Sequence, residues 1–223
     1  MHGWGGSKLS FACVAAAIEH NSVCIDFPGF GEEPCPKRAF SVEDYADWLN
    51  EKISKEKISG EVILVGHSFG GRVAIVFARK YAEFVEKLVL VDSAGVKPKL
   101  KINKVIKSIW FRFCKKCAKI GLYSKTRLAK HGSSDWKNLP ENMKGTFVKV
   151  IKQDLLPDAR MIQAETLLVW GEKDADTPLY MAEKLHGAIR NSKLIVIKNA
   201  GHYSYLDDFP QFVNLLNNFL EKE

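Results

Sequence analysis

The pattern of apolar and polar positions alternates between short strands and helices along most of the chain. Short apolar runs are typical of strands, and helical spacing of apolar residues separates them. The run at 61–66 is continuous, as in a strand that a parallel sheet buries on both faces. This alternation predicts an α/β fold with a mostly parallel, doubly wound sheet. We expect strands at 22–27, 61–66, 87–92, 166–170 and 193–197, and helices at 41–54, from the residues after Ser68 to about Tyr81, at 178–186 and at 206–220.

A basic segment interrupts this alternation. Apolar residues recur at helical spacing from 102 to 120, with lysines filling the other faces. Between 97 and 152, sixteen Lys and Arg residues stand against Asp135 and Glu141, a local charge of +14 in a chain whose net charge is +7. The sequence therefore predicts an α/β core at 1–96 and 161–223, with a helical cap inserted at 97–160.

Composition narrows the class of protein. A chain of 223 residues that is 46% hydrophobic can bury one substantial core. It contains no apolar run of the roughly 18–20 residues that a membrane span needs, and its first twenty residues do not form a secretory signal. The five cysteines have no framework spacing, and the Cys114–Cys117 pair lacks a second pair or a histidine cluster. These features predict a cytoplasmic protein with reduced thiols and no metal site.

The strongest chemical motif is Gly66-His67-Ser68-Phe69-Gly70. It fits the G-x-S-x-G pattern of a nucleophile elbow, and it stands between a predicted buried strand and a predicted helix. The glycines leave room for strand and helix to pack closely while the serine adopts a strained backbone conformation. The sequence therefore identifies Ser68 as a candidate nucleophile.

A serine hydroxyl needs a base, and that base needs an orienting acid. His202 follows the predicted strand at 193–197, at the edge where α/β sheets assemble their sites. Asp174 follows the strand at 166–170 and is the preferred acid, with Asp92 and Asp176 as alternatives. The order serine, aspartate, histidine along the chain is that of the α/β-hydrolases.

Stabilising an oxyanion requires two backbone donors. One candidate is the amide of Phe69, directly after the proposed nucleophile. The other is the amide of Trp4 in the glycine-rich turn His2-Gly3-Trp4-Gly5. We predict that these two amides form an oxyanion hole.

These motifs together resemble the α/β-hydrolase fold superfamily over nearly the whole chain. The chain is similar to the compact, capped bacterial carboxylesterases and carbon–carbon bond hydrolases, which implies a catalytic triad of Ser68, Asp174 and His202. Members of the family have strands before the His-Gly turn, whereas no strand precedes it in this sequence. We therefore expect the sheet to lack an interior strand or to fill its place otherwise.

The first functional hypothesis is an esterase-type serine hydrolase that acts on a small-molecule ester without a metal or organic cofactor. Cleavage of carbon–carbon bonds in vinylogous diketones, or of lipid esters, is an alternative, because the same triad serves these reactions. A non-catalytic α/β-hydrolase-like binding protein is an alternative of another class. The basic cap could solvate a lid or bind an acidic membrane surface. No motif accompanies it that would predict nucleic-acid binding, and the sequence predicts no oligomeric state.

Overall fold

The computed structural model describes residues 1–56, 58, 60–98 and 139–221. Most of the cap predicted at 97–160, including its basic helical pattern, therefore lies outside the described residues. The described elements follow one another as η1 (Lys8–Phe11), α1 (Ala12–Ala17), α2 (Val42–Lys55), β1 (Val62–His67), α3 (Phe69–Lys80), η2 (Ala82–Phe84), β2 (Val85–Val91), α7 (Glu141–Lys152), α8 (Leu156–Ala159), β3 (Glu165–Gly171), α9 (Tyr180–Ala188), β4 (Ser192–Ile197), α10 (Ser204–Asp207) and α11 (Phe209–Leu220).

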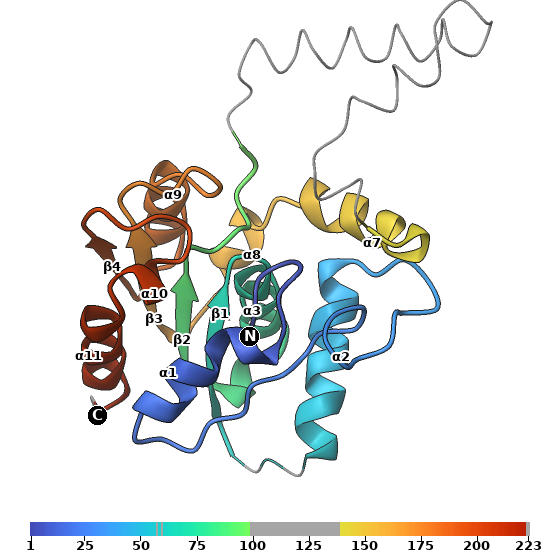
Figure 1. The fold of residues 1–223 in the computed structure, drawn as a ribbon, viewed down its shortest axis with the longest axis horizontal. Coiled ribbons are helices and arrows are strands. Elements are labelled where there is room, and N and C mark those ends of the chain that lie inside the picture. Colours follow the sequence, from blue (N-terminus) through green and yellow to red (C-terminus); the bar gives the residue numbers. More distant parts are fainter. Residues whose placement is uncertain (57, 59, 99–138, 222–223) are drawn as a thin grey trace, which may run out of the picture.

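In the described part of the chain the sheet has four parallel strands in the order β1-β2-β3-β4 (Figure 1). The central register pairs Gly66 with Leu90, Leu90 with Leu168, and Leu168 with Leu194. Because the strands are parallel, their carboxyl ends meet at one edge of the sheet. The α/β fold with a parallel sheet, predicted from the alternation of elements, is confirmed.

Helices cover both faces of the sheet, which explains why its two central strands are apolar from Leu88 to Val91 and from Leu167 to Trp170. Alternate residues of β2 and β3 point to opposite faces and join two separate clusters of buried side chains. One cluster packs Leu88, Leu90, Leu168 and Trp170 with residues of α2, α3, α8 and α9, and the other packs Val89, Val91, Leu167 and Val169 with residues of α1 and α11.

Helix α2 begins where the sequence predicts it. The hydroxyl of Ser41 accepts a hydrogen bond from the Asp44 amide at 3.3 Å, and the Asp44 carboxylate accepts one from the Ser41 amide at 2.7 Å. This reciprocal capping box satisfies amide groups that the first turn of a helix leaves without partners. The helix predicted at 41–54 is confirmed.

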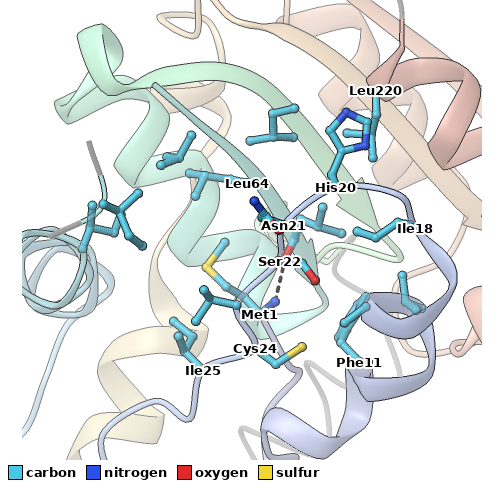
Figure 2. Close-up of a pocket in the computed structure, with 18 of the residues that line it drawn as sticks. Met1, Phe11, Ile18, His20, Asn21, Ser22, Cys24, Ile25, Leu64 and Leu220 are labelled. Carbon is cyan, nitrogen blue, oxygen red and sulfur yellow. Dashed lines mark hydrogen bonds between the residues drawn. The ribbon is translucent and has the colours of Figure 1, made fainter. Parts of the chain in front are cut away.

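The strand predicted at 22–27 is wrong. This segment is not assigned to the sheet, and no described residue forms a strand ladder with it. Figure 2 shows the reason: a pocket of about 540 Å³ is lined by residues 20–25 on one side and by β1, including Leu64, on the other. Without an adjacent strand, the segment cannot form the hydrogen bonds that define one.

Met1 occupies one end of the space beside β1. Its nitrogen donates to the Val65 carbonyl at 2.8 Å (Figure 2), and its carbonyl accepts from the His67 amide at 3.1 Å. This is the pattern of a parallel ladder, continued for a single residue. Among the described residues, Met1 alone forms backbone hydrogen bonds with this edge of β1. Met1 thereby anchors the start of the glycine-rich turn to the strand that leads to Ser68.

The helix predicted at 206–220 is two helices in the structure. Helix α10 ends at Asp207, and α11 begins at Phe209 with Pro210 in its first turn. The Asp208 side chain caps α11 by accepting from the Gln211 amide at 3.2 Å. The break follows from Pro210, because proline has no N–H to donate to the carbonyl four residues before it, so the helix cannot continue through it, whereas the first turn of a new helix tolerates it. None of the described helices has the length and apolar character that crossing a membrane would require.

Candidate active site

Ser68 lies in the sharp turn between β1 and α3, with backbone φ 49° and ψ −108°. Positive φ is uncommon for a residue with a side chain, so the elbow is strained, as its sequence predicts. The close packing comes from the flanking glycines: a Cβ added to Gly66 would stand 2.6 Å from the Gly70 carbonyl oxygen. Two hydrogen bonds hold the turn against the end of β2, from the Ser68 amide to the Val91 carbonyl and from the Ala94 amide to the Ser68 carbonyl.

His202 lies in the loop that follows β4, and its ring faces Ser68. The Nε2 atom of His202 is 3.1 Å from Ser68 Oγ, and its Nδ1 atom is 2.9 Å from Asp174 Oδ2. A carboxylate only accepts, so Nδ1 carries the proton that this bond shares, and Nε2 is left to accept the hydroxyl proton of Ser68. The structure thus brings together the three residues that the sequence singles out.

Asp174 is held by donors on all sides. Its Oδ1 atom accepts from the amides of Asp176 at 2.8 Å and Thr177 at 2.9 Å. Its Oδ2 atom accepts from the Thr177 hydroxyl at 2.6 Å as well as from His202. Thr177 is a functional residue that the sequence reasoning missed, although its position three residues after Asp174 is the local signal of such a side-chain turn.

The two alternative acids do not contact the imidazole. The carboxylate of Asp92 is buried and accepts from Gly171 and Ser204 instead. Asp176 is exposed, and its amide is bonded to Asp174. Of the three candidates, only Asp174 is within hydrogen-bond distance of His202 in the structure.

The electrostatics of the pair favour a charged acid beside a basic imidazole. Burial lowers the pKa of His202, but the hydrogen bond and the negative charge of Asp174 raise it by more, with further increases from Asp92 and Asp176. The pKa of His202 therefore lies above its ordinary value of 6.5. Burial raises the pKa of Asp174, yet the hydrogen bonds from His202 and Thr177 outweigh it and hold the pKa below 3.8.

His67, the second residue of the elbow motif, contacts the loop that carries His202, and the centroids of the two imidazole rings are 4.9 Å apart. Its Nε2 atom donates to the carbonyl of His202 at 2.7 Å, and its buried Nδ1 has no hydrogen-bond partner in the described structure. Burial lowers the pKa of His67 to about 4, so the ring is neutral near neutral pH. His67 thus anchors the loop that carries His202, a role that the sequence reasoning did not identify.

The two residues predicted to supply the oxyanion donors, Trp4 and Phe69, line the same pocket as Ser68. Phe69 is the first residue of α3, and its amide has no acceptor among the described residues, as expected at a helix start. The Trp4 amide likewise donates to no described residue. The turn that carries Trp4 is tied down: His2 Nε2 accepts from the Phe27 amide at 3.1 Å, and the Trp4 ring packs edge-on against Phe69.

A pocket of about 580 Å³ opens over these groups. Ser68 and His202 line it together with the turn at 3–6, and helix α7 supplies apolar side chains. No cluster of three or more His, Cys, Asp or Glu side chains in the described residues has the arrangement of a metal site. The main apolar side chains around the pocket are Trp4, Phe69, Phe147, Val150, Ile151 and Tyr203.

Comparison with known proteins places these features in a family. A family model described as the alpha/beta hydrolase fold matches residues 1–115, and a second model, described as TAP-like protein, matches residues 145–222. Together the two models cover the elbow, the base loop and the acid loop.

Similar proteins include several hydrolases. Lipase 3 of Moraxella sp. (strain TA144) is 26% identical over 96% of this chain and 74% of the lipase. The 2-hydroxy-6-oxononadienedioate/2-hydroxy-6-oxononatrienedioate hydrolase of Escherichia coli (strain K12) is 24% identical over 100% of this chain and 86% of that enzyme. Among solved structures, an esterase from Exiguobacterium antarcticum superposes with a TM-score of 0.77 at 22% identity, over 100% of this chain and 90% of the esterase.

Proposed function

Because the chain belongs to the alpha/beta hydrolase fold family, we propose that it is a serine hydrolase that cleaves carboxylic esters or related acyl bonds of a small molecule. The observation that carries this proposal is the continuous line of hydrogen bonds from Ser68 Oγ through the His202 ring to the buried Asp174 carboxylate. Such a line activates a serine hydroxyl and has no obvious use in a protein that only binds.

In the proposed reaction Ser68 attacks the acyl carbonyl while His202 Nε2 takes up its proton. The charged Asp174 stabilises the imidazolium that forms and keeps the ring in the required tautomer. The amides of Trp4 and Phe69 stabilise the oxyanion, and His202 then protonates the leaving alcohol. Water, activated by the same histidine, releases the acid from the acyl-enzyme.

The pocket lining supports a substrate with apolar groups beside the scissile bond. Aromatic side chains surround the proposed nucleophile, and α7 adds Val150 and Ile151 on the cap side. Apolar walls of this kind select by shape and apolar area, while polar groups of the same pocket, among them Arg72, Asp176 and Thr177, can fix the orientation of a substrate. We therefore expect p-nitrophenyl esters of medium-chain acids to be cleaved faster than the acetate, in a chain-length series measured as kcat/KM.

Labelling with a fluorophosphonate probe tests the reaction class. The folded protein is expected to be labelled, and Ser68→Ala to abolish labelling, because the probe reacts only with an activated serine. Ser10→Ala is the matched control, since Ser10 lines the same pocket without a base beside it and its loss should leave labelling intact. Absence of labelling in the folded protein, or labelling that survives Ser68→Ala, would favour a non-catalytic binding protein.

A further inference from the structure

Asp92 is a fully buried carboxylate at the end of β2 that takes no part in the proposed reaction. Its exposed fraction is 0%, and its backbone φ is 43°, in the left-handed region that residues with side chains seldom adopt. A buried carboxylate is costly unless donors satisfy its oxygens. Asp92 combines a strained backbone with a buried charge. This combination indicates that the position needs a hydrogen-bond acceptor, which an apolar side chain would not supply.

The Asp92 carboxylate accepts hydrogen bonds from both loops that carry the proposed acid and base. Oδ1 accepts from the Gly171 amide at 2.8 Å, three residues before Asp174. Oδ2 accepts from the Ser204 amide at 3.0 Å and from the Ser204 hydroxyl at 2.6 Å, two residues after His202. Asp92 forms no ion pair with any residue that the structure describes, so neutral donors from these two loops satisfy it.

The backbone alone does not hold the base loop in place. Hydrogen bonds from the Glu172 amide to Ile197 and from the Lys173 amide to Ala200 join the acid and base loops only up to residue 200. Close approach at this point depends on Gly171, because a Cβ there would lie 2.0 Å from the Gly201 carbonyl oxygen. Beyond this point the Gly201 amide donates to Asp207 at 2.7 Å, and the hydrogen bonds that tie the loop to the ends of β1 and β2 are those of the His67 and Asp92 side chains.

We propose that Asp92 is a positioning residue that sets the distance between the acid and base loops by fixing both to the end of β2. This inference rests on the proposed hydrolase function. A single rigid carboxylate defines the separation of Gly171 and Ser204, and therefore the alignment of Asp174 with His202. Small displacements of such a pair slow catalysis strongly, since a shift of about 1 Å can lower the reaction rate on the order of 100-fold.

The negative charge of Asp92 also affects the protonation of His202. The titratable groups that face it are Asp174, His202 and Tyr205. Burial raises the pKa of Asp92 to about 6, against the hydrogen bonds from Ser204 and Gly171, and its negative charge raises the pKa of His202. Near neutral pH, Asp92 is therefore mainly charged and favours the protonated form of His202 that the proposed mechanism requires.

Asp92→Asn tests the inference because it preserves shape. Whichever way the amide is turned, its NH₂ group faces an N–H donor of one loop, so one anchor is lost. We expect kcat to fall by about 10-fold to 100-fold with KM little changed, and the acid midpoint of kcat/KM to move to lower pH. Ser204→Ala, which keeps the Gly171 anchor and the Ser204 amide, should lose less than about tenfold.

Asp47→Asn is the matched control. Asp47 lies on α2, far along the chain from the site, and its carboxylate binds Lys80 and Tyr81. It should keep both kcat and the pH midpoint of the parent protein. If Asp92→Asn is folded and less stable but has the parent kcat and pH midpoint, Asp92 has only a structural role and the inference is overturned.

Hydrogen exchange separates failure of this inference from failure of the proposed function. The parent protein's reaction with the fluorophosphonate probe reports on the proposed function alone. If the parent protein is not labelled, exchange at the Gly171 and Ser204 amides decides the question of the anchor. Faster exchange at both amides in Asp92→Asn, compared with Asp47→Asn, would support the positioning role, and unchanged exchange would overturn it.

Discussion

At the scale of the residue, the candidate site depends on where His202 places its two ring nitrogens. One faces Ser68 and the other faces Asp174, whose remaining lone pairs are occupied by Thr177 and the Asp176 amide. The sequence motifs identified Ser68, His202 and Asp174, because each follows a strand of the sheet. They did not identify Thr177 or the anchoring role of His67, since both act through contacts that only the folded chain brings about.

The pH dependence of activity should report the pKa of His202. Because protonated His202 cannot accept the proton of Ser68, kcat/KM is expected to fall as pH decreases, with a midpoint above 6.5. Asp174→Asn should lower that midpoint, since Asp174 is the main group that raises the pKa. It should also reduce kcat by roughly 10³-fold to 10⁴-fold by permitting the wrong tautomer. Rates from pH 5 to 9 would test this, and a midpoint that stays in place in Asp174→Asn would contradict it.

At the scale of the element, the sequence pattern predicted correctly those helices and strands that have packing or hydrogen-bonding partners in the fold. Helix α2 begins within one residue of its predicted start, and α3 begins directly after the elbow. The segment at 22–27 has a strand-like sequence but remains an unpaired extended segment, because the pocket beside β1 lies between it and the sheet. A strand is defined by hydrogen bonds to a partner strand, so the sequence of residues 22–27 alone could not decide whether they form one.

The capping box of α2 has a measurable effect on stability. Ser41→Ala removes the hydroxyl that accepts from the Asp44 amide, and should lower the free energy of unfolding by about 1 kcal/mol. Urea denaturation of both proteins would measure the difference. Ser54→Ala is the control on the same helix: its exposed hydroxyl only returns to the Asn50 carbonyl, so we expect less than about 0.5 kcal/mol. Equal effects of the two changes would argue against the cap.

At the scale of the whole molecule, the sheet positions the residues of the candidate site. Ser68, Asp174 and His202 follow β1, β3 and β4, while the end of β2 supplies Asp92. The parallel register brings all four strand ends to one edge, and helices on both faces exclude water from the strands behind them. The site therefore requires the complete core, and its buried titratable groups link global stability to pH.

His67 provides such a link. Its pKa falls from 6.5 in the unfolded chain to about 4 in the fold, so the native state binds fewer protons between these values. The contribution of His67 to stability is present above pH 6.5 and is lost as pH falls through 4. The glutamine in His67→Gln can still donate to the His202 carbonyl but does not titrate. The free energy of unfolding of this variant should therefore not show the decrease on acidification, of up to about 3 kcal/mol, that His67 causes in the parent protein.

Urea denaturation of the parent protein and His67→Gln between pH 4 and 7 would measure this loss. The titration of Asp92, which acts in the opposite direction because its pKa is raised to about 6, is present in both proteins and cancels in the comparison. Parallel pH profiles for the two proteins would contradict the prediction.

The sequence by itself determined the fold class, the elbow at Ser68 and the proposed base, and it limited the proposed acid to three aspartates with Asp174 preferred. Those features follow from local patterns, namely the period of apolar residues and the residue types that follow each strand. The tertiary structure decided that Asp174, rather than Asp92 or Asp176, faces His202, and that Met1 pairs with β1 where a strand could lie. These outcomes depend on distances between segments far apart in sequence, which hydrogen-bond geometry and close packing specify and no local pattern contains.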